Sequence, residues 1–199
     1  ADASAIEAHL YTSLKLGSQL MAVAMLPDLS TRRLLLRPRT MADLDACIAM
    51  DRDPEVTRFI PGPWADAQAH EAFVRARMLR DWGAGLGYWS IAARAAPDRF
   101  LGWILLLPLD GEEPGIEIGW RLVRAAWGHG YASEAARPIV AHAFNTLLLS
   151  RIIAEINPGN AGSIRVAEKI GMQRDAAVPA EAGYTSFVMT RDDFHSTRA

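Results

Sequence analysis

The sequence predicts a single α/β domain in which one mixed, mostly antiparallel sheet of about six to seven strands carries helices on both faces. Three observations support this fold class. Short apolar segments of strand length follow one another through the middle of the chain, helical patterns precede and follow them, and 199 residues suit one domain with a sizeable core. We expect residues 26–195 to form this domain and residues 1–25 to be an N-terminal extension, in which the spacing of Ile6, Leu10 and Leu14 allows a short helix.

Composition and charge narrow the class of partner. Half of the residues are hydrophobic and the formal net charge is -2, which gives no indication of a nucleic-acid-binding surface. The apolar run at residues 20–26 is far shorter than the ~20 residues that cross a bilayer. Cys47 is the single cysteine, so an intramolecular disulfide is excluded and a reducing compartment is favoured. We therefore expect a cytoplasmic protein with no membrane or nucleic-acid partner, and a core position for Cys47.

The first part of the domain is predicted to be a strand followed by two helices. Residues 32–38 (RRLLLRP) have a strand composition and end in proline. Thr40 is a candidate N-cap with Asp43 three residues later, so the first helix is expected to begin there. A loop at residues 59–64 (FIPGPW) then leads into a second amphipathic helix at residues 66–82.

The middle of the chain is predicted to be an antiparallel meander. Its strands are residues 88–94, 100–108 and 115–123. Turn-like segments separate them, APD at residues 96–98 and DGEEPG at residues 110–115.

The last part alternates helices and strands. A long helix is expected at residues 131–148, with a bend or a lost hydrogen bond at Pro138. The mostly apolar residues 151–158 suit a central strand. A helix capped by Asn160 follows, and residues 183–190 form the last strand.

Gly128 and Gly130 lie in the segment RAAWGHGYASEAARP, after a predicted strand and before a predicted helix. A glycine turn at the start of a helix offers unpaired backbone N–H groups and the positive end of the helix dipole to an anion. A purely structural turn is the alternative. Neither the third glycine of a dinucleotide-binding motif nor a P-loop lysine is present. Glu134, in the first turn of the helix, is expected only to stabilise the helix start.

At this point the sequence resembles the GNAT superfamily of acyl-CoA-dependent N-acyltransferases, and most of all its RimJ/RimL-like branch of ribosomal-protein N-terminal acetyltransferases. The resemblance extends from about Arg33 to Phe194. It rests on four segments in the family's order: RLLLRP, IEIGWRLVRAAWGHGYASEA, NPGNAGSIRVAEKIGM and YTSFVMT. The second and third segments are the specific ones.

The resemblance implies a binding site for acetyl-CoA. In the family, the pyrophosphate of coenzyme A binds to a [QR]-x-x-G-x-[GA] turn, and here Trp127 replaces the first Gln or Arg. Backbone groups of Leu122 and Val123 would bind the pantetheine where two strands splay apart, a backbone N–H near Leu122 would stabilise the oxyanion, and Asn160 would also contact the pantetheine. The residues that match the pyrophosphate turn are Trp127, Gly128, His129, Gly130, Tyr131 and Ala132.

Two residues are candidates for proton transfer. An alkyl amine is mostly protonated at pH 7, so acyl transfer to it needs a base. Glu117 shares a strand face with Gly119 and Arg121 and matches a glutamate that often serves as the base in the family; pairing with Arg121 is the alternative. Ser163 matches the serine that faces the sulfur in the resembled branch, and completing the Asn160 helix cap is its alternative role.

Three tryptophans, Trp64, Trp89 and Trp120, are candidates for the wall of an acceptor pocket, with core or rim positions as the alternative. The histidines show no metal-ligand spacing, so no metal is assigned.

The function implied is acetyl-CoA-dependent N-acetylation of a primary amine, either a protein N-terminus or a small molecule. The resemblance also suggests a homodimer. A non-catalytic acyl-CoA-binding or sensing module on the same fold is the alternative, and a nucleotide-binding protein is the third hypothesis.

Overall fold

The computed structural model describes residues 26–109, 115–177 and 183–196. The predicted extension at residues 1–25 and most of the predicted turn at residues 110–115 lie outside the described residues. Within the described part of the chain, no helix is long and apolar enough to cross a membrane.

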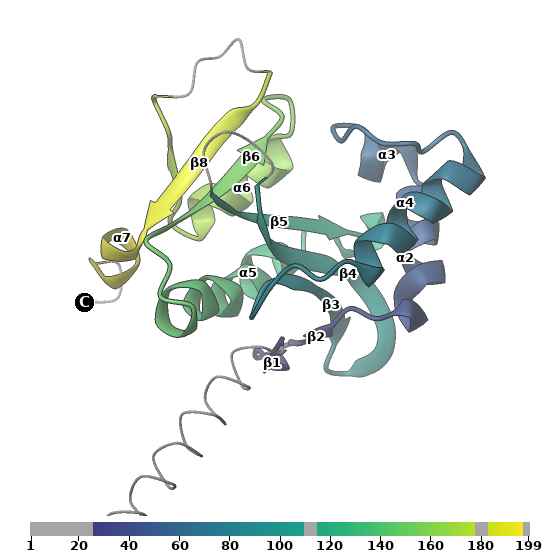
Figure 1. Cartoon of the computed structure of the whole chain (residues 1–199), viewed down its shortest axis with the longest axis horizontal. Coiled ribbons are helices and arrows are strands. Elements are labelled where there is room, and N and C mark those ends of the chain that lie inside the picture. Colours follow the sequence, from purple (N-terminus) through teal and green to yellow (C-terminus); the bar gives the residue numbers. More distant parts are fainter. Residues whose placement is uncertain (1–25, 110–114, 178–182, 197–199) are drawn as a thin grey trace, which may run out of the picture.

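An eight-stranded sheet organises the described residues (Figure 1), in the order β1-β2-β3-β4-β5-β6-β8-β7. All neighbouring strands are antiparallel except β5 and β6, which confirms the mixed, mostly antiparallel prediction. The two edge strands, of two residues each, were not predicted because they are too short to show a periodic pattern. The strands are β1 (Leu29–Ser30), β2 (Leu34–Pro38), β3 (Gly87–Ala93), β4 (Ala96–Pro108), β5 (Ile116–Leu122), β6 (Arg151–Ile156), β7 (Gln173–Arg174) and β8 (Thr185–Thr190).

The turn between β3 and β4 lies earlier than the sequence predicts. Ala93 pairs with Ala96, so the chain reverses at residues 94–95 and the predicted turn APD belongs to β4. Two register shifts near Ala92 absorb the difference in strand length. Proline is tolerated there because it lies at the hairpin end, beside the irregular part of the ladder.

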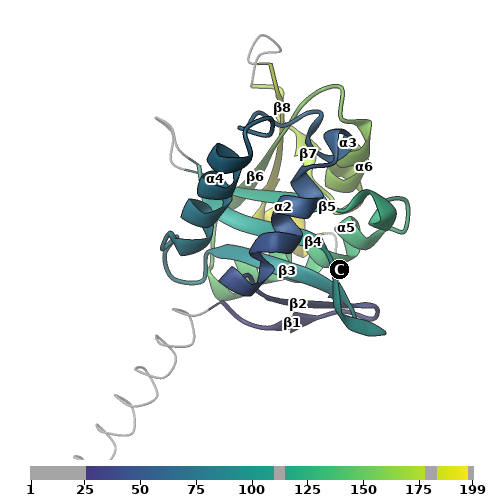
Figure 2. The same ribbon diagram turned by 90° about the vertical axis from the view of Figure 1, so that its right-hand side faces the viewer.

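Helices cover both faces of the sheet, as predicted (Figure 2). On one face, α2 and α4 pack against Tyr88, Trp103 and Leu105. On the other face, α5 packs against Trp89 and Ile104. Neighbouring residues of a strand point to opposite faces, so this division follows directly from the strand register. The helices are α2 (Leu44–Asp51), α3 (Pro54–Thr57), α4 (Ala67–Leu79), α5 (Tyr131–Ala141), α6 (Ala161–Lys169) and α7 (Arg191–Ser196).

The helix starts follow capping rules. The Thr40 amide donates to Asp43 Oδ2 at 3.0 Å in the turn that precedes α2. The Asp66 carboxylate accepts the amides of Gln68 and Ala69 at the start of α4, at 2.9 and 3.0 Å. Each cap satisfies backbone donors that have no partner inside the helix.

The long helix predicted at residues 131–148 is interrupted. Its α-helical part, α5, ends at Ala141, and a π-turn follows at His142–Thr146, in which the Leu147 amide donates to the His142 carbonyl at 3.0 Å. Pro138 lies inside α5 and has no N–H to give to the preceding turn. The π-turn begins four residues after Pro138.

Gly102 is required by the backbone packing between β4 and β5. It pairs with Leu122, at the end of β5, and its φ is +141°. A Cβ atom here would collide with the Arg121 carbonyl oxygen. We expect Gly102→Ala to lower the free energy of unfolding by about 4 kcal/mol, from backbone strain and overpacking together.

Gly183→Ala is the matched control for this measurement by chemical denaturation. Gly183 also has a positive φ, +76°, but a Cβ there meets no atom of the described residues within 4 Å. Its substitution should cost only about 1 kcal/mol. Equal losses for the two variants would contradict the packing argument.

Candidate active site

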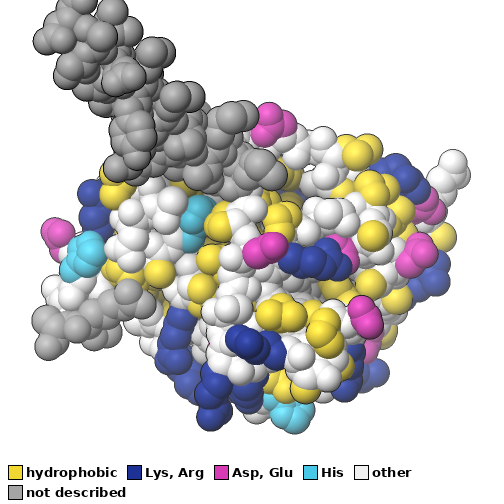
Figure 3. Space-filling model, turned by 90° about the horizontal axis from the view of Figure 1, so that it is seen from below, with side chains coloured by type: hydrophobic (Ala, Val, Ile, Leu, Met, Phe, Trp, Pro, Cys, Tyr) yellow, Lys and Arg dark blue, Asp and Glu magenta, His cyan; other side chains and the backbone are white. Residues whose placement is uncertain are grey.

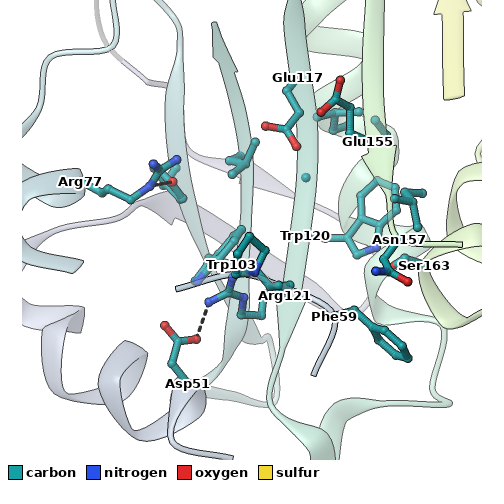
Figure 4. Close-up of a pocket in the computed structure, with 18 of the residues that line it drawn as sticks. Asp51, Phe59, Arg77, Trp103, Glu117, Trp120, Arg121, Glu155, Asn157 and Ser163 are labelled. Atoms are coloured by element: carbon teal, nitrogen blue, oxygen red, sulfur yellow. Dashed lines mark hydrogen bonds and ion pairs between the residues drawn. The ribbon is translucent and has the colours of Figure 1, made fainter. Parts of the chain in front are cut away.

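A cavity of about 340 Å³ lies on the α2 and α4 face of the sheet and reaches the place where β5 and β6 separate (Figure 4). Glu117, Trp120 and Arg121 of β5 contribute to its wall, as do Glu155 of β6 and Ser163 of α6. Helices α2 and α4 and the loop between them close the opposite side. Other lining residues include Arg39, Cys47, Asp51, Phe59, Trp64, Phe73, Arg77, Tyr88, Trp103, Leu105, Gly119, Asn157, Asn160 and Tyr184.

Strands β5 and β6 pair only at their beginning. Glu117 lies opposite Ile153, and among the described residues this is the one registered pair between the two strands. Both strands continue past it, and Figure 1 shows them diverging. The divergence leaves one side of β5 open to a ligand that can bind backbone groups.

The backbone at the end of β5 assigns different roles to the two predicted pantetheine contacts. The Val123 amide donates to the Leu101 carbonyl at 3.0 Å, so it faces β4 and is already engaged. Successive backbone amides of a strand alternate in direction, so the Leu122 amide faces the gap. The Leu122 carbonyl accepts the indole N–H of Trp127 at 2.9 Å. The structure thus leaves the amide role to Leu122.

The glycine turn presents free amides at the start of α5. Gly128 and Gly130 have φ of +77° and +74°, which glycine adopts at little cost. Within the described residues, the amides of residues 128–132 have no hydrogen-bond acceptor. A Cβ at Gly128 would meet no atom of the described part of the chain within 4 Å, so packing among these residues does not explain this glycine. The arrangement suits an anion.

Glu134 does more than stabilise the helix start. It accepts hydrogen bonds from the Thr31 hydroxyl at 2.6 Å, the Arg33 amide at 2.9 Å and Arg33 Nε at 2.6 Å. Burial alone would raise the pKa of Glu134, but these hydrogen bonds outweigh burial and lower it. Arg33 Nη2 also donates to the His129 carbonyl at 2.9 Å. The segment before β2 therefore holds the glycine turn in place.

Glu117 has the environment of a base. Burial in the cavity wall raises the pKa of its carboxyl group to about 7, and the nearby Glu155 carboxylate adds to the rise, while Arg77 opposes it. Figure 4 shows the two acidic side chains next to each other at one end of the cavity. A pKa near the working pH is what a proton acceptor needs.

Glu117 does not form the alternative ion pair with Arg121. Arg121 Nη1 instead lies 2.7 Å from Asp51 Oδ1, and His70 Nε2 lies 3.3 Å from the other Asp51 oxygen. Asp51 and His70 are almost completely buried. Arg121 also lies over the Trp64 and Trp103 rings, at 5.1 and 4.9 Å from their centroids. This cluster fixes one wall of the cavity.

Asn160 and Ser163 form the predicted helix cap and also line the cavity. The Asn160 side-chain oxygen accepts the Ser163 amide at 3.0 Å. Within the described residues, the Ser163 hydroxyl has no hydrogen-bond partner, and Figure 4 shows it on the side of the cavity next to Trp120 and Asn157. The cap therefore leaves the hydroxyl available.

The structure separates the three predicted tryptophans. Trp64 and Trp120 line the cavity, whereas Trp89 is fully buried on the α5 face, with its indole N–H donating to the Pro27 carbonyl at 2.8 Å. Its neighbour Tyr88 faces the cavity instead. Adjacent strand residues point to opposite faces, so Trp89, which follows Tyr88 in β3, faces away from the cavity.

Sequence reasoning missed several cavity residues from distant segments, among them Arg39, Asp51 and Arg77. No local motif marks them. The one available signal was the alternation of β3 and β4, which places Tyr88 and Trp103 on the face of Glu117 once the strands are in register. Cys47 is buried on α2 as expected, and burial raises its pKa to about 11, so it remains a thiol. Among the described residues, no three His, Cys, Asp or Glu side chains are grouped as metal ligands.

Comparisons with known proteins match this chain to acetyltransferases. Residues 33–173 match the model of the acetyltransferase (GNAT) domain. An uncharacterized N-acetyltransferase, p20, of Bacillus licheniformis is 32% identical over 150 residues, which cover 74% of this chain and 83% of that protein.

Solved structures share the fold. The crystal structure of an acetyltransferase from Agrobacterium tumefaciens is 30% identical, with a TM-score of 0.71, and the match covers 83% of this chain and 95% of that one. The aminoglycoside acetyltransferase AAC(6')-Ib, solved in complex with coenzyme A, is 20% identical with a TM-score of 0.68, and the match covers 83% of this chain and 99% of that one.

The buried pair of Asp51 and Arg121 yields a stability prediction. Replacing Asp51 by Asn keeps the side-chain shape but leaves the Arg121 charge buried without a counter-charge. We expect a loss of about 3 kcal/mol in the free energy of unfolding, measured with urea.

Glu71→Gln serves as the control. Glu71 pairs with Arg75 at 2.6 Å on the exposed side of α4, where both side chains are about half exposed. Its loss should cost no more than about 0.5 kcal/mol. A comparably small effect of Asp51→Asn would show that the buried pair does not stabilise the wall.

Proposed function

The chain belongs to the acetyltransferase (GNAT) domain family, and from this premise we propose that it transfers the acetyl group of acetyl-CoA directly to a primary amine. One observation carries the proposal. The raised-pKa carboxyl group of Glu117 and the Ser163 hydroxyl line one cavity, and that cavity reaches the gap between β5 and β6.

Acetyl-CoA fits this arrangement along its whole length. Its pyrophosphate binds the free amides of residues 128–132, where the dipole of α5 adds a favourable field. Its pantetheine arm enters the strand gap, beside the Leu122 amide and Asn160. Arginine and lysine side chains lie at several places on the face seen in Figure 3, and the exposed Arg124 and Arg137 flank the turn in the sequence, which suits a polyanion.

The roles of the side chains follow from their positions. Glu117 takes a proton from the acceptor ammonium, directly or through water, and the free amine attacks the thioester carbonyl carbon. A backbone N–H near Leu122 stabilises the developing oxyanion. The C–N bond forms as the C–S bond breaks, and the nitrogen, which is positively charged after the attack, gives its second proton to solvent to leave the neutral amide. The departing thiolate takes a proton from the Ser163 hydroxyl, which solvent then reprotonates.

The finer expectations are still predictions from the sequence. They comprise the RimJ/RimL-like branch, the homodimer and the cytoplasmic location. Neither a catalytically inactive acyl-CoA-binding module nor a nucleotide-binding protein is favoured by a specific feature of the cavity, and both are outcomes of the experiments below.

The pH dependence of kcat tests Glu117. A base must be deprotonated to act, so kcat should rise with pH through about 7, the pKa of this carboxyl group. Glu117→Gln should remove this limb and lower kcat by about 10²- to 10⁴-fold, with the affinity for acetyl-CoA retained. An unchanged profile in the variant would assign the titration to another group. Tight binding of acetyl-CoA by the wild type without turnover of any amine would favour the binding module.

Glu155→Gln refines this test. The Glu155 carboxylate contributes to the raised pKa of Glu117, so its removal should shift the rising limb of kcat to lower pH. Glu168→Gln is the control, because Glu168 is exposed on α6 and does not line the cavity. If both variants shift the limb equally, the local coupling between Glu117 and Glu155 is contradicted.

The glycine turn is tested by the affinity for acetyl-CoA. Gly128→Ala places a methyl group among the amides, and we expect a dissociation constant about 10- to 100-fold higher, measured by calorimetry. Gly183→Ala is a close control, since φ is +76° at Gly183 and +77° at Gly128 and neither Cβ would meet a described atom within 4 Å. Equal affinities of the two variants would contradict the cradle, and tighter binding of ATP or NAD than of acetyl-CoA would favour a nucleotide-binding protein.

A further inference from the structure

The charges that line the cavity are sorted by sign. Asp51 and Arg121 neutralise each other in the wall, at 2.7 Å. The remaining charged groups are Arg39 and Arg77, which both contact Tyr88, and Glu117 and Glu155, which lie next to each other. Figure 4 shows Arg77 reaching into the cavity from α4, across from the two glutamates on β5 and β6.

We propose that the acceptor is a small zwitterion, an amino acid or close analogue whose ammonium group binds at the glutamates and whose carboxylate binds at the arginines. This inference rests on the proposed acetyl transfer and adds to it the chemical class of the acceptor.

The two arginines are not matched by a direct counter-charge within the part of the chain that the structure describes. Among the described residues, neither Arg39 nor Arg77 forms an ion pair with a carboxylate. Arg77 Nε donates to the Tyr88 hydroxyl at 2.6 Å, which fixes the guanidinium and leaves its two terminal nitrogens for another acceptor. The Glu117 carboxylate acts on Arg77 without a direct ion pair, so two nearby cations in a partly buried site still favour a bound carboxylate.

Arg39 lies behind this group. Its guanidinium stacks on the Tyr88 ring at 3.5 Å from the centroid, and within the described part of the chain its Nε and Nη2 atoms are buried without a hydrogen-bond partner. Burial lowers the pKa of Arg39, and the positive charge of Arg77 acts in the same direction. An anion next to Arg77 would offset both the burial of the Arg39 charge and its repulsion by Arg77. Arg77 is therefore the residue that contacts the carboxylate, and the positive charge of Arg39 adds to the attraction.

The glutamate end prefers an ammonium group. Glu117 and Glu155 repel each other when both are ionised, which contributes to the raised pKa of Glu117. A bound ammonium group offsets this repulsion and can then give its proton to Glu117. Binding and deprotonation of the amine thus occur at one place.

The walls and the size of the cavity favour a small acceptor with an apolar body. Trp64, Phe73 and Trp103 contribute aromatic surface to the same cavity, and the Trp64 and Trp103 rings lie beside Arg121. The volume of about 340 Å³ is near the lower end of the roughly 300–1,000 Å³ found for small-molecule sites. A polycation such as spermidine would place a second positive charge against the arginines.

The experiment compares matched acceptors. Apolar and aromatic amino acids are assayed beside their carboxamides, with spermidine included, by following release of coenzyme A at pH 8.5, where Glu117 is ionised. Each pair differs only at the carboxylate, and the carboxamide has the less basic amine, which biases the assay against the expected result. We expect kcat/KM for at least one amino acid to exceed that for its carboxamide by about 10- to 100-fold.

Arg77→Gln should remove this preference by lowering kcat/KM for the amino acid while turnover of the carboxamide remains, and this remaining turnover also reports that the variant is folded. Arg75→Gln is the control, because Arg75 lies two residues away on α4 and pairs with Glu71 on the exposed side. It should keep the preference of the wild type.

The outcomes separate the two proposals. Turnover of the carboxamides or of spermidine as efficient as that of the amino acids overturns the zwitterion inference and leaves acetyl transfer standing. A preference that survives Arg77→Gln overturns the assignment of the carboxylate site. If acetyl-CoA binds and no amine in any form is acetylated, the proposed function itself fails.

Discussion

The separation of β5 from β6 is the constraint on which the rest of the site depends. A strand inside a sheet normally gives its backbone groups to both neighbours, and an unsatisfied buried amide is costly. Here β5 is paired with β4 along its length but with β6 only near Glu117. The open side of β5 therefore has hydrogen-bonding capacity that an extended ligand can use. The same strand carries Glu117 at one end of the gap and leads into the glycine turn at the other.

Two ion pairs between distant segments hold the parts around this gap. Glu134 and Arg33, 101 residues apart, join the start of α5 to the segment before β2 and support the glycine turn. Asp51 and Arg121, 70 residues apart, join α2 to β5 behind the cavity. The first pair is partly exposed, so its role is mainly geometric, whereas the second is buried and would be costly to break on one side only.

In the proposed reaction, the charged groups that set the pKa of Glu117 also select the acceptor. Burial and Glu155 raise the pKa of Glu117, while Arg77 limits the rise. In the proposed reaction these neighbours also bind the two ends of the acceptor. A change at either neighbour would alter both the pH dependence and the choice of substrate, and the matched substrate pairs separate the two effects.

The sequence alone determined the features that depend on local pattern. Alternation along β5 placed Glu117, Gly119 and Arg121 on one face, helix caps were predicted at Thr40, with Asp43, and at Asn160, and the glycine turn was found before α5. These features depend on backbone geometry over a few residues, and residue type and spacing determine such geometry.

Only the tertiary structure decided which distant side chains meet. It put Tyr88 in the cavity and Trp89 in the core, paired Arg121 with Asp51 and brought Arg77 opposite Glu117. Strand phase and register set these contacts, and a shift of one residue exchanges the two faces of a strand. The two arginines and the two glutamates of the cavity come from four separate segments of the chain. Their relative placement therefore cannot be predicted from any one of these segments.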